Sequence, residues 1–206
     1  MTVAENRVVS ELDALIDSVR AVRVRAGRPI VVGISGFGGS GKSTLARALV
    51  ATLPDAVRLR GDDFLDPDRS HQRSTDWDGV ERRRLVDEVL RPFQRREPGI
   101  FRRYDWGERR LGSPEPVPRG EVLVVDLIGL FHADSADAFD LRIWCDVDLE
   151  TATHRGIARD AALGRKHLDL WDEIWVPNER DFAERFDPRG AADIRFRGDV
   201  VSEKRA

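Results

Sequence analysis

Residues 30–44 of the chain read IVVGISGFGGSGKST, and this stretch carries the strongest structural signal in the sequence. Its first five residues form a continuous apolar run of mostly β-branched type, which favours a strand buried on both faces of a parallel sheet. Residues 36–43 follow with two glycines five positions apart and then Lys42 and Ser43. This spacing, between a buried strand and a helix-like stretch, is typical of a phosphate-binding loop.

The residue types in this loop suit the binding of a nucleoside triphosphate. Glycines let the backbone adopt positive φ angles, so that successive N–H groups point at one cluster of phosphate oxygens, and the following helix adds its positive end. We expect Lys42 to place a charge at the β- and γ-phosphates and the Ser43 hydroxyl to ligate Mg²⁺. A plain Gly-Ser turn would need neither the Lys-Ser pair nor so many glycines. The predicted nucleotide-binding residues are Gly36, Gly38, Gly39, Ser40, Gly41, Lys42, Ser43 and Thr44.

Strand-like and helix-like segments alternate along the chain. Apolar residues at helical spacing predict an amphipathic helix from Val8 to Val22, inside an N-terminal segment of residues 1–27 that ends at Gly27. Further helices are expected at 43–53, 79–91 (closed by Pro92), 149–163 and 169–186, and strands at 56–60, 121–126, 141–147 and 192–196. This alternation predicts an α/β fold with a doubly wound, mainly parallel sheet of the P-loop NTPase type.

Residues 97–120 interrupt the alternation with Gly, Pro, Arg and aromatic residues. A connection of this length is more often a functional insertion than a plain turn. The chain shows no internal repeat and no low-complexity linker. We therefore expect one domain over residues 1–206, with an inserted arm at 97–120.

Composition and charge exclude several classes of protein. The 34 Lys and Arg residues nearly balance the 37 Asp and Glu residues, for a net charge of −3, so we expect no broadly basic surface and no nucleic-acid partner. The single cysteine, Cys145, excludes an intramolecular disulfide, and no apolar stretch approaches the ~20 residues of a membrane span. With no apolar run near the N-terminus, we expect no signal peptide, no membrane partner and a cytoplasmic location. The sequence is compatible with a homo-oligomer.

Carboxylates follow two of the predicted strands. Asp126 ends an apolar strand, which is where the second, Mg²⁺-organising carboxylate of such folds sits. Asp62 and Asp63 follow the strand at 56–60, so they also emerge at the edge where open α/β sheets bind ligands. One of them could act as general base for a hydroxyl nucleophile or as a water-bridged metal ligand. A solvated acidic turn or a helix cap is the alternative at this point.

Four motifs together resemble one family. They are GISGFGGSGKST at 33–44, GDDF at 61–64, YDW at 104–106 and R-x-x-x-RD at 155–160, and they occur in this order. Over residues 28–198 the chain resembles the uridine kinase-like branch of the P-loop kinases, the phosphoribulokinase/uridine kinase family. The resemblance implies a kinase that uses ATP and Mg²⁺ to phosphorylate a hydroxyl of a small molecule, first of all a nucleoside.

The resemblance also implies roles for individual residues. Asp62 would be the base for the acceptor hydroxyl and a metal ligand with Ser43 and Asp126, while Lys42, Arg155 and Arg159 would act on the transferring phosphoryl group. The two arginines would belong to a helical lid at 155–168, and their i, i+4 spacing puts them on one helix face. A surface pairing with Glu150 or Asp160 is the alternative for them. The expected acceptor-binding residues are Asp63, Asp76, Tyr104 and Trp106.

The chain departs from the family pattern at three places. Asp126-Leu127 stands where family members commonly carry Glu-Gly, Asp76-Trp77-Asp78 replaces Asp-His-Pro, and Leu65 replaces an aromatic residue. The acceptor therefore stays open between a nucleoside and a pantothenate-like, sugar-like or specialised-metabolite hydroxyl.

Two other classes compete with a kinase. Residues 126–129 match the Asp-x-x-Gly pattern of regulatory GTPases, but guanine selection uses Asn-Lys-x-Asp, and neither Asn6 nor Asn178 precedes a lysine. The second class is a nucleotide-binding protein without catalysis, and the altered residues 126–127 support it. The combined motifs favour the kinase.

Overall fold

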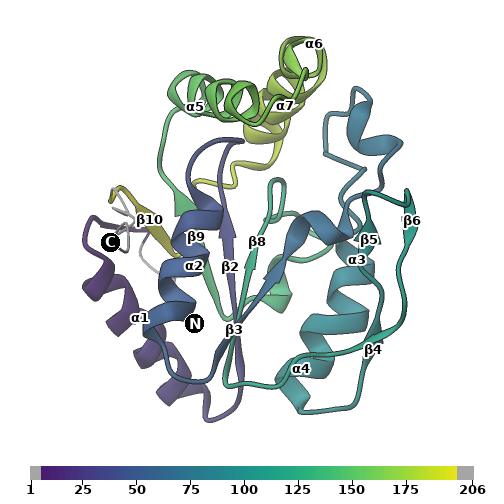
Figure 1. Ribbon diagram of the computed structural model, residues 1–206. Coiled ribbons are helices and arrows are strands. Elements are labelled where there is room, and N and C mark those ends of the chain that lie inside the picture. The colour runs from purple at the N-terminus through teal and green to yellow at the C-terminus, as the bar shows by residue number, and fades with distance from the viewer. Residues whose placement is uncertain (1–5, 199–206) are drawn as a thin grey trace.

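The computed structural model describes residues 6–198 and contains a parallel six-stranded sheet at its centre. The strands are β1 (Arg7–Val9), β2 (Ile30–Ser35), β3 (Ala56–Arg60), β8 (Val122–Asp126), β9 (Leu141–Cys145) and β10 (Ile194–Phe196). Their order in the sheet is β1-β10-β9-β2-β8-β3, and every neighbouring pair is parallel. Helices cover both faces (Figure 1), which confirms the predicted doubly wound α/β fold.

Two apolar layers hold the helices to the sheet. On one face, α1 (Leu12–Ala26) and α2 (Lys42–Thr52) bury Leu15, Val19 and Leu49 against alternate strand residues such as Val32. On the other face, α3 (Arg82–Leu85), a π-helical turn (Val86–Leu90) and α4 (Arg91–Arg95) pack against residues such as Val31. Because successive strand side chains point to opposite faces, the continuous apolar run of β2 feeds both layers.

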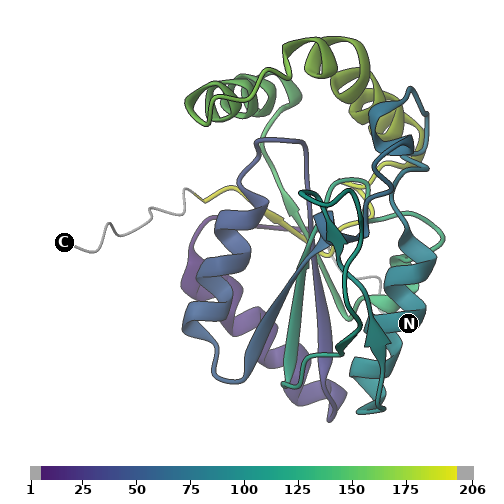
Figure 2. The same ribbon diagram turned by 45° about the vertical axis from the view of Figure 1, so that its right-hand side comes forward.

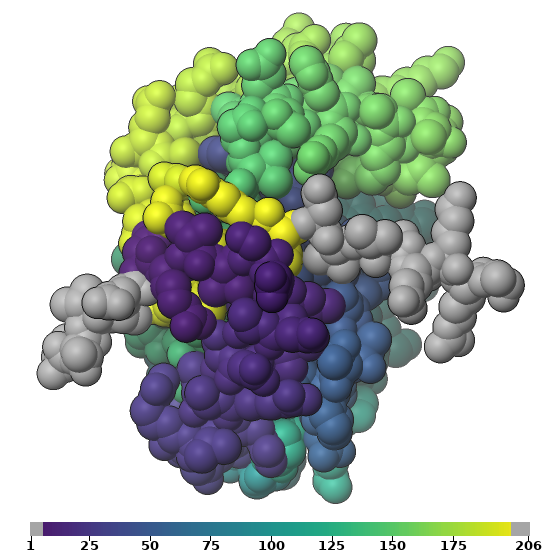
Figure 3. Space-filling model, turned by 90° about the vertical axis from the view of Figure 1, so that its left-hand side faces the viewer, coloured from purple at the N-terminus to yellow at the C-terminus, as the bar shows by residue number. Residues whose placement is uncertain are grey.

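The N-terminal segment differs from its prediction. Residues 7–9 form β1, which pairs with β10 at the edge of the sheet, and the helix begins at Leu12 rather than at Val8. The prediction of helix at Val8 was wrong because the two valines fit an extended edge strand whose partner lies far along the chain. Figure 3 shows this N-terminal segment beside the strand near the C-terminal end. The helix ends as predicted at Gly27, which has a φ of 63°.

Pro92 does not close its helix as predicted. The helical segment continues to Arg95, and Pro92 lies in the first turn of α4. The π-helical turn before it shifts the hydrogen bonds by one residue, so that Arg91 N–H donates to Val86 O. A proline directly after such a turn lies where the helix starts again, and its missing N–H is tolerated there.

The other predicted helices and strands are confirmed within a few residues at their ends. Residues 97–120 hold two short antiparallel pairs, β4 (Ile100–Phe101) with β7 (Glu115–Pro116) and β5 (Tyr104–Asp105) with β6 (Arg110–Leu111). Above the carboxyl ends of the strands lie α5 (Leu149–Ala162), α6 (Leu168–Leu170), a second π-helical turn (Trp171–Trp175) and α7 (Val176–Phe186). Figure 2 shows these elements arching over the sheet. Among the described helices, none has the length and apolarity needed to cross a membrane.

Candidate active site

The loop between β2 and α2 has the backbone that a phosphate-binding loop requires. Gly39 and Gly41 have φ values of 86° and 95°, in the left-handed region that glycine adopts without strain. A Cβ atom at Gly39 would also clash with the backbone of Ala152 and Gly156 in α5. The loop therefore lies directly against α5.

Lys42 is folded onto its own loop. Its Nζ donates to the carbonyl oxygens of Gly36 at 2.9 Å and Phe37 at 2.8 Å. Burial lowers the pKa of Lys42, while the nearby carboxylates of Glu179, Asp62 and Asp126 oppose that shift. The ammonium is held where the loop can present it to a bound phosphate.

Asp126, at the end of β8, is fixed by two partners. Arg58 Nε donates to Oδ1 at 2.7 Å, Arg58 Nη2 donates to Oδ2 at 2.8 Å, and the Ser43 hydroxyl donates to Oδ2 at 2.7 Å. The side chain of Asp126 is 4% exposed. Its hydrogen bond to Asp126 raises the pKa of Arg58.

The side chains of Ser43, Asp126 and Asp62 fit a Mg²⁺ ion that also binds phosphate oxygens. Ser43 lies in the first turn of α2, Asp126 ends β8 and Asp62 follows β3, and the Ser43 hydroxyl donates to Asp126. Proteins usually hold Mg²⁺ through one or two carboxylates together with waters and substrate phosphates, and these side chains supply oxygen atoms of that kind. Residues 6–198 hold no cluster of three or more His, Cys, Asp or Glu side chains arranged for a metal.

Asp62 opens into a cleft beside the loop. It lies in the 3-10 turn Gly61–Phe64 that follows β3, and its side chain is 57% exposed, with Arg60 Nη2 at 4.0 Å from its Oδ2. Enclosure by the walls of the cleft raises the pKa of Asp62, and the charge of Asp126 adds to that rise against the opposing Lys42 and Arg60. A carboxylate with a raised pKa is a better proton acceptor.

The cleft in front of Asp62 measures about 480 Å³ and joins several predicted residues. Gly38, Gly39, Lys42, Ser43, Asp62, Trp106 and Arg159 all line it. Its other walls are rich in aromatic rings, contributed by His71, Trp77, His167, Trp171 and Trp175. The phosphate loop, the candidate base Asp62 and the aromatic side chains that could contact an acceptor therefore line one cavity.

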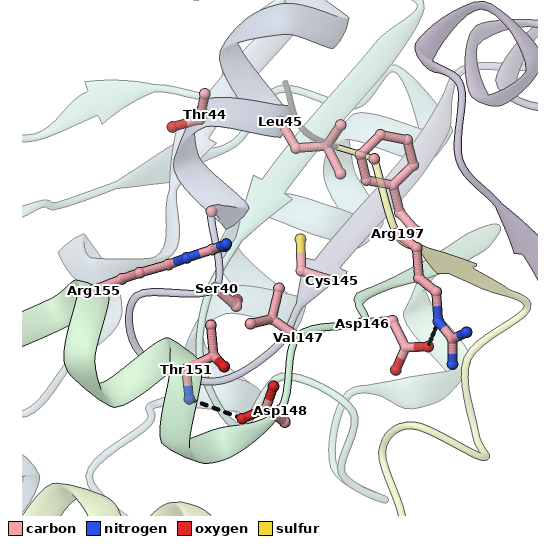
Figure 4. A pocket seen from close by; sticks show the side chains of 13 residues that line it. Ser40, Thr44, Leu45, Cys145, Asp146, Val147, Asp148, Thr151, Arg155 and Arg197 are labelled. Carbon is pink, nitrogen blue, oxygen red and sulfur yellow. Dashed lines mark hydrogen bonds and ion pairs between the residues drawn. The ribbon is translucent and has the colours of Figure 1, made fainter. Parts of the chain in front are cut away.

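The two predicted lid arginines lie in different places. Arg155 extends from α5 into a second pocket of about 360 Å³, which also contains Thr44, Asp146 and Arg197 (Figure 4). Arg159 lines the main cleft, but its guanidinium is bound to the neighbouring Asp160, with Nη2 to Oδ1 at 2.9 Å. The two arginines therefore face different pockets here, and Arg159 makes the pairing with Asp160 that was the alternative for it. Their action on the transferring phosphoryl group stays a prediction.

Three predicted acceptor-binding residues do not line the cleft. Asp63 is buried, and its Oδ2 accepts a bond from Arg103 Nη1 at 2.7 Å. The carboxylate of Asp76 accepts from the Ser74 hydroxyl at 2.8 Å. Tyr104 is buried against Trp106, with 4.8 Å between ring centroids. In this arrangement the three residues bond to or pack against neighbouring side chains, and their contact with an acceptor stays a prediction.

The sequence reasoning missed two charged residues of the site, Arg58 and Glu179. Glu179 on α7 is buried, and its Oε1 accepts a hydrogen bond from the N–H of Gly38 at 2.6 Å. The signal for it is a carboxylate four residues after Trp175, on the inward face of an amphipathic helix. Burial raises the pKa of Glu179 to about 7.

Comparison with known proteins places this geometry in context. A uridine kinase from Leuconostoc citreum is 32% identical over 145 residues, which cover 65% of this chain and 69% of the relative. A uridine kinase from Streptococcus gordonii is 25% identical over 188 residues, which cover 81% of this chain and 89% of the relative. The family model described as methylmalonyl Co-A mutase-associated GTPase MeaB matches residues 1–61, the part that contains the phosphate loop.

Two solved structures share the fold. A possible uridine kinase from Bacillus stearothermophilus superposes with a TM-score of 0.69 at 17% identity, over 90% of this chain and 97% of the other. A candidate fructose transport system kinase from Silicibacter sp. TM1040 gives a TM-score of 0.70 at 22% identity, over 92% and 100%. At these identities the likeness shows the fold.

The parallel sheet, the glycine-rich loop ending in Lys42 and Ser43, and the helices above it define a P-loop kinase of the nucleoside kinase type. The chain belongs to the uridine kinase family.

Proposed function

We propose that the protein transfers the γ-phosphoryl group of ATP to a hydroxyl group of a small molecule, with a nucleoside as the first candidate acceptor. The observation that carries the proposal is that Lys42 of the phosphate loop and the carboxylate of Asp62 open into the same cleft. The names of the relatives, uridine kinases, support the nucleoside.

In this proposal, the two pockets bind different parts of the reactants. The pocket with Thr44, Arg155 and Arg197 adjoins the start of α2, which suits it to the base and ribose of the nucleotide. The loop N–H groups and Lys42 would hold the phosphates. Ser43 and Asp126 would hold a Mg²⁺ ion, which would supply positive charge at the phosphates.

Asp62 is the proposed base for the acceptor. The acceptor hydroxyl oxygen forms a bond to the γ-phosphorus, the bond to the leaving ADP oxygen breaks, and the hydroxyl proton passes to the Asp62 carboxylate. Trp106 and Trp175 line the cleft on the acceptor side, and such rings favour an acceptor with a flat or apolar face.

An acceptor screen tests the proposal. The purified protein is mixed with Mg²⁺, ATP and one acceptor at a time from a panel of uridine, cytidine, pantothenate and common sugars. We expect acceptor-dependent release of ADP and a product heavier by one phosphoryl group by mass spectrometry, strongest for a nucleoside. Normal ATP binding without transfer to any acceptor would favour a nucleotide-binding protein without catalysis, and preferred use of GTP would favour the GTPase.

A further inference from the structure

Glu179 is a buried carboxylate that faces the phosphate loop. It lies in the first turn of α7 and is 4% exposed. Its Oε1 accepts the hydrogen bond from Gly38 N–H at 2.6 Å. Its Oε2 is buried and finds no hydrogen-bond partner among the described residues.

The bond to Gly38 occupies a donor of the kind that the loop offers to phosphate. Backbone N–H groups of such a loop converge on phosphate oxygens, and a carboxylate is an anion that accepts the same bonds. The charge of the Lys42 ammonium acts on Glu179 as well, because it opposes the rise in the pKa of Glu179. Glu179 therefore interacts with one donor and one charge that a terminal phosphate would use.

We propose that Glu179 is an internal competitor of the terminal phosphate of the nucleotide: its carboxylate occupies the Gly38 amide in the free protein, and binding of ATP displaces it. The inference rests on the proposed function, because it takes the ligand of the loop to be a nucleoside triphosphate. ADP lacks the terminal phosphate, so Glu179 can stay on Gly38 when ADP is bound.

The burial of Glu179 argues against a purely structural role. A buried carboxylate with one oxygen unpaired costs stability, and a structural carboxylate would have both oxygens bonded. The same burial raises the pKa of Glu179 to about 7, because it disfavours the charged carboxylate relative to the protonated acid. A carboxylate that is held to the loop by a single hydrogen bond is easier for an arriving phosphate to displace.

The contact also connects the nucleotide to the acceptor cleft. A Cβ atom at Gly38 would lie 2.8 Å from Trp171 and 3.0 Å from Glu179, so the second π-helical turn and α7 pack directly onto the loop. Next to Glu179 on α7, the Asn178 side chain accepts from Ser74 N–H at 2.9 Å and donates to Gln72 O at 2.8 Å, close to His71 of the cleft wall. Displacement of Glu179 therefore acts on a helix that also holds the rim of the cleft.

Glu179→Gln tests the competition. Glutamine keeps the size of the side chain and can still accept from Gly38, but it carries no charge. Binding of ADP and of a non-hydrolysable ATP analogue is measured by calorimetry with Mg²⁺ at pH 8, where the wild-type carboxylate is mostly ionised. We expect the ATP analogue to bind the variant about tenfold more tightly than wild type, which corresponds to about 1.4 kcal/mol. The affinity for ADP should change less than threefold.

Glu184→Gln is the matched control, because Glu184 is an exposed residue of the same helix and its substitution changes the net charge equally. We expect wild-type affinities for this control, and circular dichroism verifies that both variants fold. An analogue affinity in Glu179→Gln equal to or weaker than wild type overturns the proposal. An equal gain for ADP, or no nucleotide binding by any variant, also overturns it.

Hydrogen exchange of the wild-type protein gives a second test that needs no variant. Peptides from residues 171–186 should exchange faster with the ATP analogue than with ADP, because only the analogue releases Glu179 from the loop. Equal exchange with both ligands contradicts the proposal. Neither measurement needs phosphoryl transfer, so a failed acceptor screen with the expected binding pattern would refute the proposed function alone.

Discussion

Asp62 and Asp126 lie at the carboxyl ends of two neighbouring strands, yet their surroundings suit them to different tasks. Both oxygens of Asp126 are bonded to Arg58, and one also to Ser43, so its position is fixed. Asp62 faces the open cleft with Arg60 as a distant partner, and its pKa is raised. Environment alone thus separates the carboxylate that can take a proton from the one that organises the site.

Asp62→Asn should remove turnover and keep nucleotide binding. The amide cannot accept the hydroxyl proton, so we expect kcat to fall by a factor of ~10²–10⁴, with the ATP affinity within about threefold of wild type. Steady-state kinetics with the best acceptor and calorimetry with the ATP analogue measure the two quantities. Asp68→Asn, at an exposed position nearby, serves as control. Near-wild-type turnover of Asp62→Asn would show that another group takes the proton.

Arg58→Ala should destabilise the fold much more than Arg60→Ala. The two arginines lie in the same strand, but Arg58 pairs with an Asp126 side chain that is 4% exposed, and Arg60 pairs with Asp62 at 4.0 Å in the open cleft. Loss of Arg58 leaves a buried charge without its partner, for about 3 kcal/mol, against less than about 1 kcal/mol for the exposed pair. Urea unfolding compares them, and equal losses would mean that Asp126 needs no counter-ion.

The stability of the protein should depend on the ionisation of Glu179. Its folded pKa is raised from 4.5 to about 7, so the stability it contributes is full below pH ~4.5 and is lost as the pH rises through 7. Relative to wild type, Glu179→Gln should therefore gain free energy of unfolding between pH 5 and pH 8. The pKa of Asp62 is raised too, but both proteins share that residue. Urea unfolding at several pH values gives the difference, and parallel pH curves would contradict it.

Among the elements, the two π-helical turns follow one pattern. Val86–Leu90 is followed by Pro92, and Trp171–Trp175 is followed by Pro177 in the first turn of α7. In both, the first N–H after the π turn donates five residues back, to Val86 O or Trp171 O. Each π-helical turn thus allows the helical segment to continue past a proline. Trp171 and Trp175, the first and last residues of the second turn, line the cleft.

The joint between α5 and α6 depends on Asp160. This buried carboxylate accepts bonds from Trp171 Nε1 at 3.0 Å and from Arg159 Nη2 at 2.9 Å, and Arg165 Nη1 lies at 3.5 Å. Burial works to raise the pKa of Asp160, but these donors outweigh it and lower the pKa. The joint is therefore held by a charged carboxylate at neutral pH.

Asp160→Asn should loosen this joint. The amide cannot accept from three donors with the strength of a carboxylate, so we expect a loss of about 2 kcal/mol and faster cleavage by trypsin after Arg165 and Lys166. Urea unfolding and timed proteolysis measure the two effects. Asp172→Asn, an exposed residue of the second π-helical turn, should behave as wild type. An unchanged cleavage rate in Asp160→Asn would show that other contacts hold the joint.

For the whole molecule, local patterns predicted most of the fold and about half of the site. Neighbouring residues alone determine the strand and helix periods and the glycine-rich loop pattern. The buried strands, the flanking helices and the surroundings of Lys42 were therefore predictable. The pairing of Glu179 with Gly38 spans 141 positions, and that of Arg58 with Asp126 spans 68. No local pattern encodes such contacts, and the wrong start of the first helix has the same origin.

The arginine-rich composition also has a structural meaning that the sequence did not reveal. Several arginines join distant segments through shared carboxylates: Glu121 accepts from Arg23 and Arg96, and Asp146 accepts from Arg189 and Arg197. In the structure, these ion pairs connect the start of β8 and the end of β9 to neighbouring segments.

The edge strand β1 has a consequence for the order in which the protein is assembled during synthesis. β1 pairs with β10 and with no other described strand, and β10 ends at Phe196. Residues 7–9 leave the ribosome early but must wait with open hydrogen-bonding groups until residues 194–196 have emerged. Long-range pairing of this kind is slow and leaves a nascent chain exposed to wrong partners. The central strands can pair earlier, so the sheet would be completed at this edge, and only after translation has passed β10.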